Sequence, residues 1–304
     1  MTNAMRQYLY ARAYRLTLGP ASGGDGYTYG NTVNATSALR IAFEVDKAAV
    51  GAANKGTVDL FNVSQATRTA LVRGYQVILD AGYQGLMERL LTGTILKATT
   101  RREGPDIVTT LDVIDGLKSC LYAVFDRTYP KNTRLAKILS DIAQAMDVKP
   151  GLVVGLPDKP FPRGFTVHGL CKETLETLLK PHGLEASVQN GKLNILPRGA
   201  SLGSSAVVLS PQTGLLGIPS VALTAVEFEA LLNPKLVPGQ LVKLVTANPN
   251  TSGYFKIRSC KMSGDTHDAK WTVAAQAVRA SNVVGELAPA QGFDYGQAVV
   301  EGLI

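Results

Sequence analysis

The sequence has few of the residue types on which metal and redox sites depend. Its 304 residues include three cysteines, three histidines and one tryptophan. Cys120, Cys171 and Cys260 lie far apart, with no CxxC pair and no histidine at ligand spacing. The pattern therefore predicts reduced thiols in a reducing cytosol, no metal and no other cofactor.

Long apolar runs are also absent. No run reaches the roughly 18 to 20 residues needed to cross a bilayer, and the opening MTNAMRQ leads into no apolar signal core. We therefore expect no membrane insertion and no secretion. The formal net charge of +7 comes from basic residues spread along the chain. Such dispersion argues against a dedicated nucleic-acid surface and is equally compatible with an acidic protein partner.

Catalytic signatures are missing as well. No GxSxG motif surrounds a serine, and the histidines His168, His182 and His267 have no evident serine or cysteine partner. GGDG at 23–26 lacks the helix and the Lys-Ser/Thr pair of a phosphate loop. We expect no catalytic residues and no cofactor-binding residues.

Two acidic groups need weighing. Asp106 and Asp112 share a strand face by even spacing while Asp115 does not, and an exposed strand face and a turn explain the three better than an acid/base pair. GDTHD at 264–268 could grip a metal, but its spacing fits no established loop and favours a solvated hairpin tip. We expect no metal ligands.

Residues 1–118 carry the alternation of half-buried strands. Leu39, Ile41 and Phe43 alternate with other residues, which predicts antiparallel sheet. Several such runs with glycine-rich corners suit a small barrel. The segment 21–38 is rich in glycine, asparagine and serine, and its composition predicts a long flexible loop.

Residues 119–200 change period. NTRLAKILSDIAQAMDV repeats apolar residues every three or four positions, which predicts a helix capped by Asn132 or Thr133, and KETLETLLK predicts a second. Asn190-Gly191 lies between two alternating runs and predicts a two-residue hairpin. This stretch is therefore expected to be a small α+β insert.

Residues 201–280 return to strands, including the one that carries Trp271, and predict a second barrel with this tryptophan in its core. Residues 281–304 predict an extended C-terminal tail. The expected class is α+β, mainly β, with two antiparallel β-barrel domains around a small α+β inserted domain. Near the start, Tyr8, Tyr10 and Tyr14 fit either a subunit-interface strip or ordinary packing of a first strand.

Five segments occur in an order that resembles a known family. They are LRIAFEVDKAAVGAANKGTVDLFNVSQATRTAL (39–71), REGPDIVTTLDVIDG (102–116), NGKLNILPRG (190–199), AVVLSPQTGLLGIP (206–219) and LLNPKLVPGQLVKL (231–244). In this succession the chain resembles baseplate hub proteins of contractile-tailed bacteriophages, the T-even-type hub family.

The resemblance implies a structural virion protein of the tail baseplate that is assembled in the bacterial host cytoplasm. It implies tube-type barrel domains at 1–118 and 201–280, an insert at 119–200, and a homotrimer that joins a six-fold tail tube to a three-fold central spike. The implied partners are the spike, the tail tube protein, the tape measure protein and baseplate wedge proteins. DNA would pass through the lumen without sequence-specific binding.

Two other function classes stay open at this point. A tail-associated cell-wall hydrolase would need paired carboxylates, zinc or a Cys/His pair at plausible spacing, and none is evident. A carbohydrate- or nucleic-acid-binding barrel would show itself by a steep salt dependence in filter binding. The basic residues Lys97, Arg101, Arg102 and Lys118 fit either a solvated face or contact with passing DNA.

Overall fold

The computed structural model of the chain describes residues 11–20, 26–32, 37–48, 54–71, 73–115, 123–158, 160–189, 191–198, 200, 206–222 and 225–280. The chain divides into two compact units. Unit 1 combines residues 1–48, 54–115 and 206–279, and unit 2 combines 49–53, 116–205 and 280–304. Most of the described backbone is strand, which confirms the mainly β class.

Unit 1 is built on one 13-stranded sheet. Its strands are β1 (Arg12–Gly19), β2 (Tyr27–Gly30), β3 (Ile41–Ala48), β4 (Lys55–Phe61), β5 (Gln76–Tyr83), β6 (Leu86–Glu103), β7 (Asp106–Ile114), β15 (Val207–Leu209), β16 (Leu215–Val221), β17 (Val226–Leu231), β18 (Leu241–Leu244), β19 (Gly253–Asp265) and β20 (Trp271–Arg279). The main path runs β16-β17-β20-β19-β3-β4-β7-β6-β5-β1-β2, and β15 and β18 join it at β19.

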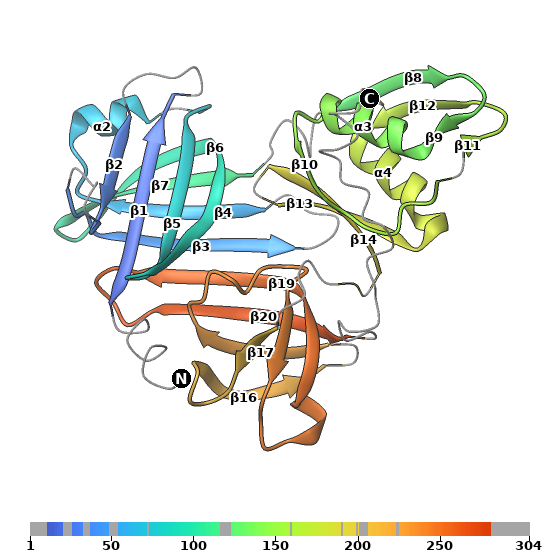
Figure 1. Ribbon diagram of the computed structural model, residues 1–304. Coiled ribbons are helices and arrows are strands. Elements are labelled where there is room, and N and C mark those ends of the chain that lie inside the picture. The colour runs from blue at the N-terminus through green and yellow to red at the C-terminus, as the bar shows by residue number, and fades with distance from the viewer. Residues whose placement is uncertain are drawn as a thin grey trace. The chain divides into compact units, whose positions relative to one another are not determined.

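Strand β19 connects the early and late parts of unit 1 (Figure 1). One of its edges pairs with β20, and the other pairs first with β18 and then with β3. Met262 faces Val45 and Gly264 faces Phe43 across the β19–β3 pair. The two strand-rich stretches that the sequence separates therefore share one sheet.

They also share one hydrophobic core. Alternate residues of β3 and β4 are buried, as the period-2 pattern predicts. The same cluster contains Leu16 and Leu79 from the early part and Phe255 and Trp271 from the late part. Within the described residues the path ends at β2 and β16 without closing, so no closed barrel is detected.

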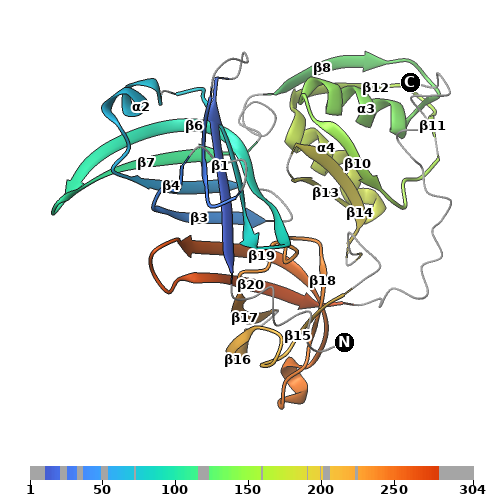
Figure 2. The same ribbon diagram turned by 60° about the vertical axis from the view of Figure 1, so that its left-hand side comes forward.

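A long hairpin and a short helix complete unit 1. The tip of the long β6–β7 hairpin projects from the rest of the sheet, as Figure 2 shows. Helix α2 (Gln65–Ala70) begins at Ser64, whose hydroxyl accepts a hydrogen bond from the Thr67 amide at 3.1 Å. Serine is a favoured residue at this position, because its hydroxyl oxygen satisfies an amide that the helix leaves free.

The segment 21–38 corrects one expectation. Its described part includes strand β2, which pairs antiparallel with β1, so it is not wholly a loop. Tyr27 and Tyr29 stack with ring centroids 6.4 Å apart. Pairing with β1 outweighs the glycine-rich composition, because strand propensity depends mainly on neighbouring contacts.

Unit 2 contains both helices and strands. Its strands are β8 (Val124–Tyr129), β9 (Thr133–Arg134), β10 (Lys149–Val153), β11 (Pro160–Phe161), β12 (Phe165–Leu170), β13 (Leu184–Gln189) and β14 (Lys192–Pro197). Its helices are α3 (Leu135–Ala145), α4 (Cys171–Leu179) and the short 3-10 helix η2 (Lys180–His182). A second 3-10 helix, η3 (Pro249–Thr251), belongs to unit 1.

The core of unit 2 confirms both predicted helices. Each contacts a strand of the β8–β12 ribbon and a strand of the β10-β14-β13 sheet. Arg134 precedes the first residue of α3 and makes no side-chain cap, so the expected cap at Asn132 or Thr133 is wrong. The Thr133 hydroxyl donates to the Pro130 carbonyl instead. The predicted β13–β14 hairpin is present, with Gly191 at φ +74. No helix in the described part of the chain is long and apolar enough to span a bilayer.

Candidate assembly surfaces

The acidic residues singled out in the sequence lie in separate environments. Asp106, at the start of β7, accepts a hydrogen bond from the Asn62 side-chain Nδ2 at 2.8 Å. Asp112 is half-buried further along the strand, and Asp115 is buried beside Asn54. The described residues contain no group of three His, Cys, Asp or Glu side chains that could hold a metal ion. Asp106 therefore lies at the start of β7, Asp112 lies within it, and Asp115 lies in the turn that follows.

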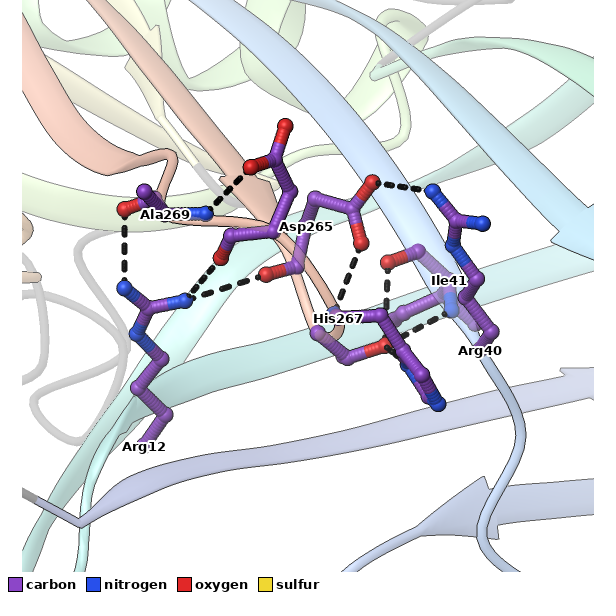
Figure 3. Close-up of polar contacts among 8 residues, drawn as sticks. Arg12, Arg40, Ile41, Asp265, His267 and Ala269 are labelled. Carbon is purple, nitrogen blue, oxygen red and sulfur yellow. Dashed lines mark hydrogen bonds and ion pairs between the residues drawn. The ribbon is translucent and has the colours of Figure 1, made fainter.

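The GDTHD segment forms the turn between β19 and β20 (Figure 3). Asp265 accepts hydrogen bonds from the Arg40 guanidinium at 3.1 Å and from the His267 amide at 2.8 Å. The Thr266 hydroxyl accepts one from the Ile41 amide. Burial raises the pKa of Asp265, but these backbone and Arg40 hydrogen bonds outweigh it and lower that pKa. The turn is a structural hairpin tip.

Arg12 of β1 fastens this turn to the start of the chain's first strand. Its guanidinium donates to the carbonyl oxygens of Asp265 at 3.3 Å, Ala269 at 2.8 Å and Asp268. It also lies 5.5 Å from the centre of the Trp271 ring. Figure 3 shows the planar group facing the turn's backbone. Arg12 therefore holds three backbone carbonyl oxygens of the turn, a role that sequence spacing alone does not reveal.

Replacing Arg12 with alanine is expected to lower the free energy of unfolding by about 1–2 kcal/mol, because the turn loses its charge-assisted donors. Arg12→Lys is the matched control: it keeps the charge but cannot reproduce the fork, so we expect an intermediate loss. Urea denaturation measures the loss, and hydrogen exchange of the 265–270 amides localises it. Equal stability of both variants and the native chain would contradict the role.

Tyr14 lies inside unit 1. Its side chain is 3% exposed, and its hydroxyl bonds to both the amide and the carbonyl of Leu39. Burial raises its pKa. These contacts favour the packing interpretation for Tyr14. Tyr8 and Tyr10 lie outside the described residues, so an interface role for the three tyrosines stays a prediction.

The structure also places the cysteines, His182 and Trp271. Cys171 and Cys260 are buried free thiols, and Cys120 lies outside the described residues. His182 is exposed at the end of η2, next to Gly183 in the left-handed conformation. Trp271 is 1% exposed, which confirms its predicted place in the core.

Two strands end the main sheet path of unit 1 and are candidate assembly edges. On β16, Ile218 is 88% exposed and Val221 is 60% exposed. The register of β16 against β17 shifts between Leu216 and Ser220, so the strand is irregular where Ile218 and Pro219 lie. Large exposed apolar side chains on an edge strand mark an interaction surface. Pro219 within this strand is typical of an edge strand, but the serine, glycine and proline content of 201–220 made the strand hard to predict.

The basic residues near the β6–β7 tip are partly neutralised within the chain. Arg101 pairs with Glu103 at 2.7 Å and with Asp59 at 3.9 Å, and its guanidinium also reaches Thr110. Arg102 donates to the Gly104 carbonyl at 3.3 Å. Lys118 lies outside the described residues. These contacts favour the solvated-face interpretation over a DNA contact.

Several solved structures share this fold at low sequence identity. The 43 kDa tail protein of prophage MuSo2 from Shewanella oneidensis has a TM-score of 0.63 at 12% identity, over 88% of this chain and 98% of that one. A tail protein from Neisseria meningitidis MC58 has a TM-score of 0.62 at 8% identity, over 90% and 98%. The E. coli c3393 protein, a type VI secretion component similar to the T4 tail proteins gp27 and gp5, has a TM-score of 0.58 at 12% identity, over 83% and 77%.

Sequence comparison identifies the family. A search of curated protein sequences finds no match. The family model for the baseplate hub protein gp41, however, matches residues 25–277, which covers both units and most of the chain. This agrees with the resemblance seen in the sequence. The chain therefore belongs to the baseplate hub gp41 family and is a structural, non-enzymatic component of a phage tail.

Proposed function

We propose that three copies of this chain close into a ring at the centre of a contractile tail's baseplate. The ring joins the six-fold tail tube to the three-fold central spike and continues the DNA channel. In each copy the tube-type modules are residues 1–118 and 201–280, the insert is 119–200, and 281–304 form an extended tail. The virion tail is the location that the family implies.

The observation that carries this proposal is the open sheet of unit 1. Within the described residues its main path ends at β2 and β16, and β16 presents the exposed Ile218 and Val221. An uncovered edge offers a row of backbone donors and acceptors to another strand. Pairing the edges of one copy with those of the next would bury the apolar side chains and give main-chain hydrogen bonds.

Symmetry accounts for the number of copies. Two strand-built modules in each of three chains would present six similar surfaces, which match six tube subunits on one side. The three-fold arrangement remains on the other side for the spike. Among the proteins with this fold, the c3393 protein is described as similar to both gp27 and gp5 of phage T4, which supports association with spike components. Tape measure and wedge proteins would bind around the same ring.

Mass measurement of the purified chain, alone and with its spike protein, tests the ring. We expect a trimer, at least when the spike is present, and Ile218→Asp should shift it towards a folded monomer because a charge would be buried at the β16 edge. Leu152→Asp is the matched control. Leu152 is 41% exposed on β10 of unit 2, and its substitution should leave the trimer intact.

Three results would count against the ring. A native chain that stays a monomer with the spike would exclude the ring. A trimer that is insensitive to Ile218→Asp, or that is disrupted equally by Leu152→Asp, would exclude the β16 edge as its contact. Circular dichroism spectra of both variants should match that of the native chain, which separates loss of assembly from loss of folding.

A further inference from the structure

Four side chains of unit 1 form a row that begins on β19 and β3 and continues through the residue before β4 and the residue after β7. Cys260 on β19 faces Lys47 on β3. The β3–β4 register pairs Asp46 with Lys55, which places Asn54 opposite Lys47 one step further. The β4–β7 register pairs Lys55 with Ile114, and the Asp115 amide donates to the Asn54 carbonyl at 2.9 Å. Lys47, Asn54 and Asp115 are therefore cross-strand neighbours.

This row is buried although it is polar. Lys47 is 3% exposed, Asn54 2% and Asp115 5%. The neighbouring row on the same face consists of apolar side chains and a glycine, with Val45 opposite Gly56 and Met262 opposite Val45. Such burial keeps water away from the three groups and leaves them to interact with one another.

Within the part of the chain that the structure describes, the buried amine of Lys47 lacks the hydrogen bonds that would stabilise its charged form. Its Nζ has no hydrogen-bond partner among the described residues. Burial lowers its pKa, although the nearby Cys260 and Asp115 act in the opposite direction. A buried lysine amine with a lowered pKa is available as a neutral nucleophile.

Asn54 and Asp115 supply the other two parts of an acyl-transfer site. The Asn54 Nδ2 donates to the Asp115 Oδ2 at 3.0 Å. The carboxyl group therefore lies against the nitrogen that would leave the asparagine side chain. A carboxyl group in this place can carry a proton between an attacking and a leaving nitrogen.

We propose that Lys47 and Asn54 join in an intramolecular amide bond, with Asp115 as the proton carrier. The Lys47 Nζ forms a bond with the Asn54 Cγ, and the bond from Cγ to Nδ2 breaks. One proton leaves Nζ, passes through the Asp115 carboxyl group and reaches Nδ2, which departs as ammonia. No oxidant or co-reactant is needed. The bond ties the end of β3 to the start of β4 and replaces a buried amine by a neutral amide.

Intact mass under denaturing conditions tests the proposal directly. Relative to its sequence, the native chain should be lighter by about 17 Da, the mass of one ammonia molecule. Trypsin should fail to cut after Lys47, because the side chain no longer carries an amine. The resulting peptide, residues 41–55, should give no fragment ions from breaks between positions 47 and 54. An unmodified mass would overturn the proposal.

Three variants separate this bond from other losses of ammonia. Lys47→Met should restore the full mass. If Asn54 instead closed a ring onto its own backbone, the Lys47→Met variant would still lose ammonia, and that result would overturn the proposal. Lys55→Met is the matched control: Lys55 is exposed beside Asn54, and this variant should keep the loss. Asp115→Asn should also restore the full mass, and complete cross-linking in that variant would remove Asp115 from the reaction. Because the mass is measured under denaturing conditions, the result does not depend on whether the chain assembles into a trimer.

Discussion

Replacing Trp271 with alanine is expected to destabilise unit 1 by about 3–5 kcal/mol, the largest loss among the substitutions considered. The side chain is 1% exposed and packs edge-on against Phe43, with ring centroids 5.3 Å apart and an interplanar angle of 77°. Its Nε1 donates to the Gly82 carbonyl at 3.2 Å. Removal would leave a cavity and also a buried acceptor without its donor.

This tryptophan joins parts of the chain that are far apart in sequence. Phe43 lies on β3, Gly82 on β5 and Trp271 on β20, so the loss should weaken the pairing of early with late strands. Urea denaturation measures it, and Trp271→Phe is the matched control, which keeps a ring but removes the N–H donor. We expect Trp271→Phe to lose clearly less stability than Trp271→Ala. A loss below about 1 kcal/mol for Trp271→Ala would show that the core refills easily.

Replacing Asp141 with alanine is expected to destabilise unit 2 by about 2–3 kcal/mol. Asp141 of α3 is 5% exposed and accepts hydrogen bonds from Arg127 at 2.7 Å, Tyr129 at 2.9 Å and Lys137 at 2.9 Å. The expected loss of stability is smaller than for a fully buried ion pair, because the Arg127 and Lys137 side chains are about half exposed and would be hydrated after the substitution. The buried Tyr129 hydroxyl would lose its acceptor.

The same residue predicts a pH dependence. Burial raises the pKa of Asp141, but the hydrogen bonds from Lys137, Tyr129 and Arg127 outweigh it and hold that pKa below its ordinary value. A carboxyl group with a lowered folded-state pKa stabilises the fold above its unfolded pKa of about 3.9, and this contribution disappears as the pH falls further. Unit 2 should therefore lose stability below about pH 4.

Asp141→Asn serves as the control for this dependence, since it keeps the shape of the side chain without its charge. Denaturation of the native chain and the variant between about pH 3 and pH 7 should show their difference in stability shrinking as the pH falls. A difference that is constant over this range would exclude the ionised carboxylate as its source.

Local structure followed from local patterns. Alternation over residues 39–45 predicted β3, the three-and-four spacing predicted α3, and Asn190-Gly191 predicted the β13–β14 hairpin. Each of these depends on side chains within a few residues of one another, where periodicity is informative. The resemblance to hub proteins was confirmed by the family comparison, whereas the trimer and its partners stay predictions.

Long-range pairing could not be read in this way. Nothing in β3 or β19 specifies that Lys47 faces Cys260, because any strand with the right alternation could pair there. The Arg12 contacts join residues at least 253 positions apart, so local patterns do not predict them. The same holds for the row formed by Lys47, Asn54 and Asp115. Ile218 was concealed by the glycine- and proline-rich text around it, although an edge strand tolerates both residues.

The pairing of β3 with β19 has a consequence for synthesis on the ribosome. Ile41 and Thr266, which bond to each other at this junction, are 225 residues apart. At about 5–20 residues per second, translation needs on the order of ten seconds or more to supply the second partner. During that interval the edge of β3 that later pairs with β19 has no partner from its own chain. Growth temperature and chaperone supply should therefore govern the soluble yield of this chain more strongly than the stability of the finished molecule.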